Sequence, residues 1–137
     1  MERVKQAADA AGLDKWIRSL DDGYHTILGA SKGIRVSGGQ KQRIGLARAI
    51  YGEPSVLVLD EPNSNLDIEG TAALQQLLRN MKKQRKMTCV VVTHSPEILD
   101  TMDKLLVLRE GRAVQFGPKN YVFKGLMKAQ QAFSRAG

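Results

Sequence analysis

The segment Val56-Leu57-Val58-Leu59-Asp60-Glu61 places two carboxylates directly after four consecutive apolar residues. An apolar run of this kind predicts a strand covered on both faces, as in a parallel sheet flanked by helices. Ligands bind at the carboxyl ends of the strands in such sheets. Asp60 is therefore a candidate to hold Mg²⁺, and Glu61 a candidate to orient an attacking water. The sequence Asp-Glu-Pro is also ordinary turn chemistry, so the segment alone leaves both interpretations open.

Other strands and helices alternate with this segment along the chain. Apolar runs at residues 89–92 and 105–108 predict two more strands of one sheet, and residues 112–116 follow the hairpin turn Glu110-Gly111. Helices are predicted by apolar spacing or by capping residues at 4–10, 14–20, 38–51, after Asp67, after Ser95 and at 120–135. This order predicts an α/β layer architecture with a mostly parallel sheet. Because a three-stranded apolar sheet needs neighbours, we expect the chain to be part of a domain.

The composition of the 137 residues, 42% apolar and 26% charged, is that of a globular protein. No apolar run approaches the roughly 20 residues that a membrane helix needs, and no secretory signal is visible at the N-terminus. The single cysteine, Cys89, excludes an internal disulfide, and two histidines exclude a histidine-based zinc cluster. We therefore expect a reducing, cytosolic setting.

The net charge of +7 is concentrated in one place. Within residues 79–86 there are five cations and no acid. Such a cluster can bind nucleic acid or anionic lipid, or it can be the solvated C-terminal end of a helix. We favour the helix end and expect no nucleic-acid partner, because the cluster contains no aromatic residue that could stack on a base.

Two further motifs are candidates for chemistry. In Ser37-Gly38-Gly39-Gln40, serine and glutamine form a capping-box pattern, but each glycine weakens a helix start by roughly 1 kcal/mol relative to alanine. Exposed backbone N–H groups at a helix start can also bind a phosphate, so both interpretations stay open. His94 follows a predicted strand and is of interest if that strand shares a sheet with the strand ending at Asp60.

Taken together, these motifs resemble the ATP-binding cassette (ABC) ATPases, from about Val4 to Pro118. The family's signature motif resembles Val36-Ser37-Gly38-Gly39-Gln40-Lys41-Gln42-Arg43, and its Walker B carboxylates match Asp60-Glu61. Its D-loop resembles Ser64-Asn65-Leu66-Asp67, and its switch histidine matches His94. The fold that the resemblance implies is part of a P-loop NTPase core with part of the helical subdomain.

Two stretches narrow the resemblance to exporters. Asp22-Gly23-Tyr24-His25-Thr26 looks like a stretch of exporter-type cassettes. The run from Leu59 to Asp67 resembles exporters of type I protein-secretion systems, in which Asn63-Ser64-Asn65 replaces the more usual Thr-Ser-Ala.

The resemblance implies a role for each matched residue. Two cassettes close head to tail around two ATP molecules, and Ser37, Gly38 and Gly39 contact the γ-phosphate of ATP held mainly by the opposite cassette. Gln40 and Asp67 are also expected among the nucleotide-binding residues. Asp60 helps to place Mg²⁺, Glu61 acts on the attacking water, and His94 contacts the γ-phosphate. Asp67 forms part of the contact between the cassettes.

The chain also departs from the family pattern. The Walker A motif, Gly-x-x-x-x-Gly-Lys-Ser/Thr, is absent, since none of the thirteen glycines precedes a lysine. The adenine-stacking aromatic and the Q-loop glutamine are missing as well, so we expect Met1 to fall inside the helical subdomain. Residues 29–33 are one residue longer than the corresponding exporter loop and lack its acid, which puts coupling to a membrane partner in doubt.

These observations lead to one main expectation and two alternatives. We expect residues 1–53 to be part of the helical subdomain, 54–118 the C-terminal part of the ATPase core, and 119–137 a C-terminal helix. The resemblance implies ATP hydrolysis powering export as the parent activity, with a second cassette and a transmembrane domain as expected partners at the cytoplasmic face of the bacterial inner membrane. The alternatives are a soluble cassette acting on nucleic acid or ribosomes, and a non-enzymatic remnant or complementing half-cassette.

Overall fold

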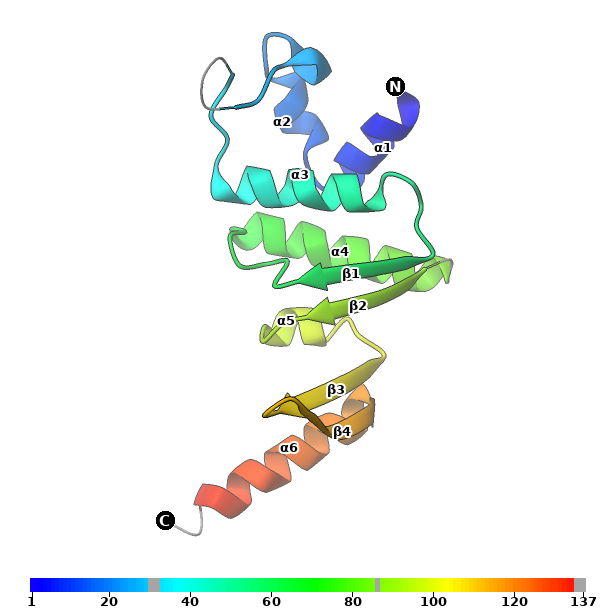
Figure 1. Cartoon of the computed structure of the whole chain (residues 1–137), viewed down its shortest axis with the longest axis vertical. Helices are drawn as coiled ribbons and strands as arrows, with labels where there is room; N and C mark the ends of the chain where they lie inside the picture. Colours follow the sequence, from blue (N-terminus) through cyan, green and yellow to red (C-terminus); the bar gives the residue numbers. More distant parts are fainter. Residues whose placement is uncertain (30–32, 86, 135–137) are drawn as a thin grey trace. The chain divides into compact units, whose positions relative to one another are not determined.

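The computed structural model describes residues 1–29, 33–85 and 87–134 (Figure 1). The chain divides into two compact units, Met1–His94 and Ser95–Gly137, which are described one after the other. The order of helices and strands is the one predicted from the sequence. Among the described helices, none combines the length and the apolar character that crossing a bilayer requires.

The first unit begins with a helical part. It contains α1 (Glu2–Ala10), α2 (Asp14–Arg18), the short 3₁₀ helix η1 (Gly23–His25) and α3 (Gly38–Ile50). Helix α1 packs against α3, and their facing surfaces bury small and aliphatic side chains: Ala7, Ala8, Leu46 and Ile50. These contacts anchor α3, the helix that begins with the paired glycines.

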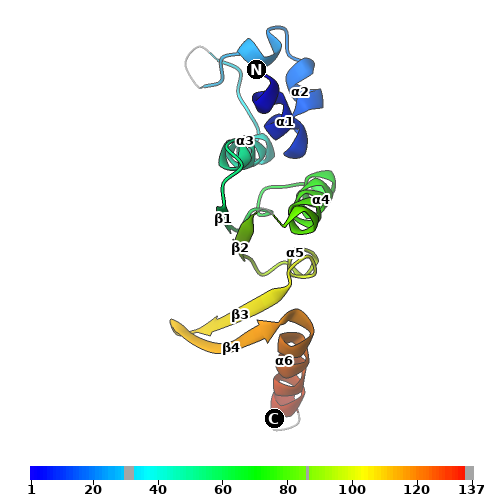
Figure 2. The same ribbon diagram turned by 90° about the vertical axis from the view of Figure 1, so that its right-hand side faces the viewer.

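A β-α-β unit follows in the same part of the chain. Strands β1 (Val56–Asp60) and β2 (Thr88–Val92) are parallel, with Asp60 opposite Val92, and α4 (Ile68–Gln84) connects them. Helix α4 lies against one face of this sheet (Figures 1 and 2). The core between them contains buried leucines from both sides: Leu57, Leu59, Leu74, Leu77 and Leu78. The predicted α/β class with a parallel sheet is therefore confirmed.

The opposite face of the β1–β2 sheet is exposed to solvent in the part of the chain that the structure describes. Four valines on it, Val56, Val58, Val90 and Val92, are between 48% and 66% exposed. Their apolar sequence predicted strands covered on both faces. The described residues supply α4 for one face only, which agrees with the expectation that the chain is part of a domain.

The basic cluster lies at the C-terminal end of α4, as the helix-end interpretation predicted. Lys82 and Lys83 are exposed in its last turn, and Arg85 ends the helix in a left-handed conformation with φ of 51°. Cations at this position interact favourably with the negative end of the helix dipole. Lys86 is outside the described residues.

The second unit contains α5 (Pro96–Leu99), β3 (Lys104–Arg109), β4 (Arg112–Pro118) and α6 (Lys119–Ser134). Strands β3 and β4 form the predicted antiparallel hairpin, and Glu110 and Gly111 both have positive φ, as a tight two-residue turn requires. The expectation that residues 105–108 join the sheet of the other two apolar strands is wrong, because β3 pairs with β4 in a separate sheet. An apolar run predicts that a strand is buried but does not predict which strand it pairs with. Here the two-residue turn after β3 makes β4 its antiparallel neighbour.

Candidate functional site

Glu61 and His94 meet at the carboxyl ends of β1 and β2. His94 Nδ1 lies 2.9 Å from Glu61 Oε1, within hydrogen-bonding distance, although the residues are 33 positions apart. The Glu61 backbone N–H donates to the Val92 carbonyl at 2.8 Å, which continues the strand pairing by one residue. The prediction that the strand before His94 shares a sheet with the strand ending at Asp60 is confirmed. This shared sheet is what brings the imidazole to the carboxylate.

The backbone of Glu61 is strained. Its φ is +42°, in the left-handed region that residues other than glycine rarely occupy. Such conformations cost on the order of 1–3 kcal/mol and persist only where the surroundings hold them. In the described part of the chain, Glu61 Oε2 is buried and lacks a hydrogen-bond partner. A buried carboxylate oxygen without a partner is costly to desolvate, so folding alone gives no reason to keep it there.

Asp60 is exposed at the last position of β1, directly before Glu61. Within the described ranges, no group of three or more His, Cys, Asp and Glu side chains is arranged to hold a metal ion. A single carboxylate fits Mg²⁺, which is commonly held by one or two protein carboxylates together with phosphate oxygens and waters. Asp60 therefore fits a Mg²⁺ ion whose other ligands are waters and the phosphate oxygens of a bound substrate.

The start of α3 is closed by a full capping box. Ser37 Oγ accepts a hydrogen bond from the Gln40 N–H at 3.1 Å, and the Ser37 N–H donates to Gln40 Oε1 at 2.7 Å. The Gln40 side chain is thus engaged in the cap. The structural interpretation of this pattern is confirmed, and it leaves the backbone of the two glycines as the candidate anion-binding element.

Gly39 has a second reason to be glycine. A Cβ atom at this position would lie 2.9 Å from the backbone oxygen of Asn65, a separation that real Cβ atoms essentially never show. The segment 61–67 therefore crosses directly over the start of α3. Close packing here offsets part of the helix propensity that the glycines lose, a reason that the sequence did not reveal.

A pocket of about 550 Å³ opens beside this crossing. Its lining includes Trp16 of α2, residues 37–40, and Asn65 and Asp67 from the segment after β1. Apart from Asp60, Glu61 and His94, every predicted site residue lines this pocket: Ser37, Gly38, Gly39, Gln40 and Asp67. The predicted residues thus fall into two groups within the first unit.

Asp67 has two partners. Its Oδ1 accepts the Gly70 N–H at 2.7 Å, which confirms the predicted helix cap, and it also accepts from Arg43 Nη2 at 2.9 Å. Arg43 Nη1 donates to the Gly12 carbonyl at 3.2 Å. Arg43 therefore ties α3 to the start of α4 and to the turn between α1 and α2.

Gln42 lies within the stretch that resembles the signature motif, and the sequence alone assigned it no role. Its Nε2 donates to the Glu61 carbonyl at 2.9 Å and to Ser64 Oγ at 3.4 Å, and its Oε1 accepts the Asn65 N–H at 2.9 Å. These partners lie 19 to 23 residues away, so local spacing carries no signal of them.

The loop predicted to differ from exporters, residues 29–33, includes residues 30–32, which lie outside the described part of the chain.

Comparisons with known proteins agree with this geometry. Residues 1–64 match the family profile described as ABC transporter, and residues 34–100 match one described as AAA domain, putative AbiEii toxin, Type IV TA system. The chain is 42% identical over 130 residues to the type I secretion system ATP-binding protein PrsD of Rhizobium meliloti, covering 95% of this chain and 22% of that protein. It is 43% identical over 117 residues to ABC transporter B family member 13 of Arabidopsis thaliana, covering 85% of this chain and 9% of the relative.

A solved structure is similar over nearly the whole chain. It is that of a bacterial Atm1-family ABC exporter with ATP bound, with a TM-score of 0.78 and 28% sequence identity. The similarity covers 96% of this chain and 23% of the exporter chain. This chain therefore spans less than a quarter of each of these relatives.

Proposed function

The chain is part of the ATP-binding domain of an ABC transporter, and from that premise we propose that it contributes to ATP hydrolysis that powers transmembrane export. The observation that carries the proposal is the 2.9 Å contact between His94 and Glu61 at the carboxyl ends of two parallel strands. His94 is 88% and Glu61 35% exposed at the side chain. Ion pairs this exposed contribute on the order of 0–1 kcal/mol to folding stability. The contact therefore does little to stabilise the fold, which favours a functional reason for it.

Each residue at the strand ends has a proposed role. Glu61 orients and polarises the attacking water, and its exposed contact with His94 at the strand ends supports that role. His94 contacts the γ-phosphate, and Asp60 helps to hold Mg²⁺. The ion supplies charge neutralisation on the phosphate oxygens when bound, while the protein residues contribute positioning.

The second group of residues acts on another ATP molecule. We infer that Ser37, Gly38, Gly39 and Gln40 bind the γ-phosphate of ATP held by an opposing cassette, and that Asp67 lies at the contact between the two cassettes. The capped start of α3 beside an open pocket supports this assignment, because backbone N–H groups at a helix start attract phosphate. The Gln40 side chain serves the cap, so its contribution comes through the backbone.

The 137-residue chain by itself is proposed to bind ATP weakly and to hydrolyse it negligibly. Most of the phosphate cradle in this family comes from the Walker A loop, and the 137 residues contain no Gly-Lys pair. Activity then requires a cassette half that carries this loop.

We further propose that residues 1–53 are part of the helical subdomain, 54–118 part of the ATPase core and 119–137 a C-terminal helix.

The transport system proposed for the chain is type I protein secretion. The relative from Rhizobium meliloti, named as a type I secretion system ATP-binding protein, supports this choice. The partners are then a second cassette and an exporter transmembrane domain, which would hold the chain at the cytoplasmic face of the bacterial inner membrane.

Complementation tests the function. The chain is co-expressed with a cassette half that carries a Gly-x-x-x-x-Gly-Lys-Ser/Thr loop, and ATP turnover is measured with and without Glu61→Gln. Since general-base catalysis typically contributes about 10²–10⁴-fold, we expect Glu61→Gln to lower turnover by at least about 100-fold.

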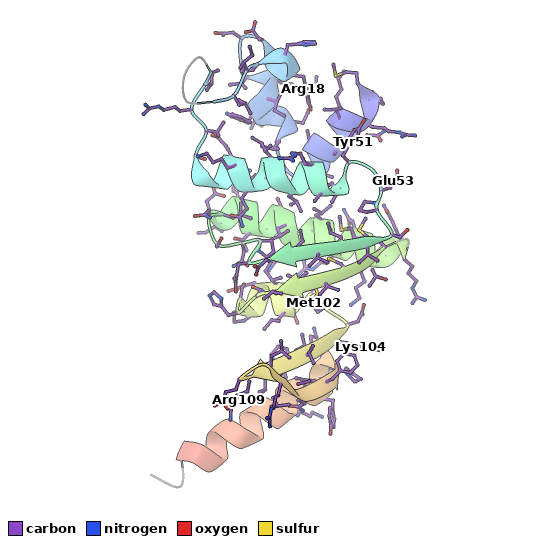
Figure 3. All side chains as sticks on the ribbon, in the orientation of Figure 1. Arg18, Tyr51, Glu53, Met102, Lys104 and Arg109 are labelled. Carbon is purple, nitrogen blue, oxygen red and sulfur yellow. The ribbon has the colours of Figure 1, made fainter. Side chains whose placement is uncertain are left out.

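Glu53→Gln is the matched control. Glu53 also has a left-handed backbone, with φ of 48°, but it lies on the turn between α3 and β1 (Figure 3). Turnover in the complemented sample that survives Glu61→Gln would contradict the role of Glu61. Turnover of millimolar ATP by the chain alone, abolished by Glu61→Gln, would contradict the proposed dependence on a second half.

A further inference from the structure

Gln42 holds both ends of the turn that follows β1. Its side-chain amide donates to the Glu61 carbonyl at 2.9 Å, and its amide oxygen accepts the Asn65 N–H at 2.9 Å. One side chain on α3 therefore satisfies a backbone acceptor at the start of the turn and a backbone donor at its end. Backbone groups paired in this way restrict how the turn can move.

The residue at the start of that turn is the strained one. The left-handed backbone of Glu61 makes three hydrogen bonds: its N–H donates to the Val92 carbonyl, and its carbonyl accepts from the Ser64 N–H and from the Gln42 side chain. The first belongs to the strand pairing and the second to the turn itself. The third comes from α3 and ties the Glu61 peptide to the position of that helix.

The same helix carries the candidate phosphate site at its start. Gly38 and Gln42 are four residues apart on α3, or about 6 Å along the helix axis. An α-helix moves over so short a length as a rigid body. A shift of the Ser37–Gly39 end is therefore passed to Gln42, and through it to the Glu61 carbonyl.

We propose that Gln42 is a positioning residue that sets the Glu61 carboxylate against His94 according to the position of α3. This inference rests on the proposed function for the role of Glu61. In that setting, phosphate bound at the start of α3 adjusts the hydrolytic glutamate of the same cassette, which belongs to the other ATP site. A single side chain would connect the two sites.

The test observes His94 in the nucleotide-free chain. The chain has two histidines, so the imidazole ¹⁵N resonances of His94 and His25 are separable, and His25 in η1 serves as an internal reference. With Gln42→Ala, we expect the His94 resonances to move while those of His25 stay in place. Amide exchange at Asn65 should accelerate by roughly tenfold, because its acceptor is lost.

Gln42→Glu separates the two halves of the contact. An ionised glutamate can still accept the Asn65 N–H but cannot donate to the Glu61 carbonyl. We expect this variant to keep the slow exchange of Asn65 and still to move His94. Gln76→Ala, which removes an exposed helical glutamine bonded to Asn80, is the control and should change neither signal.

His94 resonances that stay at their wild-type positions in the Gln42 variants would overturn the proposal. If Gln42→Ala does not fold, Gln42→Glu decides the question by the same measurement. No nucleotide is present in this experiment, so an unmoved His94 leaves the ATP-hydrolysis proposal standing. A failure of complementation would in turn leave the Gln42 result intact.

Discussion

At the scale of single residues, two carboxylates each satisfy two partners. Asp14 accepts the Tyr24 hydroxyl and the Arg18 Nε–H, both at 2.6 Å, and Asp67 accepts a backbone N–H and the Arg43 guanidinium. Hydrogen bonds from Arg18 and then from Tyr24 lower the pKa of Asp14. Asp14 joins α2 to η1, and Asp67 joins the start of α4 to α3, so each carboxylate links elements that are separate in the chain.

Tyr24 provides a prediction about pH. Burial, followed by the hydrogen bond to Asp14, raises the pKa of Tyr24 from 10.0 to about 12. Because folding favours the neutral phenol, the stabilisation is complete below pH 10 and is lost as the pH rises from 10 towards 12. We expect Tyr24→Phe to remove this part of the pH dependence of the urea midpoint. A tyrosinate absorbance titration should show one tyrosine ionising late in the wild type, and its absence would contradict the prediction.

At the scale of elements, α3 is shaped by the segment that crosses it. Gly39→Ala should destabilise the chain by about 1–3 kcal/mol, because the new Cβ would overlap the Asn65 carbonyl and force the two elements apart. Gly45→Ala lies in the same helix with open space around it, so it should stabilise by roughly 0.5–1 kcal/mol. Urea unfolding measures both. A gain in stability from Gly39→Ala equal to that from Gly45→Ala would show that the crossing is not tight.

The start of α4 depends on Asp67. Asp67→Ala removes the acceptor of the Gly70 N–H, and loss of such a cap costs about 1 kcal/mol. Asp67→Asn keeps a capping oxygen but loses the negative charge beside Arg43. We expect the alanine variant to be the less stable of the two in urea unfolding. Equal stabilities would assign the role of Asp67 to its charge and not to the cap.

At the scale of the whole molecule, the exposed apolar face of the β1–β2 sheet is the surface that we expect to cause self-association. Val58 and Val90 are 66% and 48% exposed on neighbouring strands, and exposed apolar strands favour association. We expect the purified chain to self-associate and to bind a hydrophobic dye.

Replacing both valines by threonine tests this expectation, because threonine keeps the β-branch but adds a hydroxyl. The double variant should elute as a smaller species in size-exclusion chromatography with light scattering. Val4→Thr, on an exposed site of α1, is the control and should leave association unchanged. A monomeric wild type without dye binding would contradict the prediction.

Much of the fold followed from residues close together in the chain. Ser37 and Gln40 are three positions apart, as are Asp67 and Gly70, and Glu110-Gly111 is a dipeptide. Capping boxes, helix starts and tight turns depend on a few neighbouring residues, so their energetics can be estimated before any tertiary contact is known. The apolar runs likewise predicted β1, β2 and β3 as strands.

Tertiary structure decided the rest. Only the course of the chain shows that Gly39 meets the Asn65 carbonyl and that Gln42 reaches Glu61. Each of these depends on where one element crosses another, and a local pattern of apolar and polar residues records that an element is buried without recording which element buries it. The placement of Asp60, Glu61 and His94 at neighbouring strand ends could therefore be anticipated from residue types and order, while the contact of the Gln42 side chain with the Glu61 carbonyl could not.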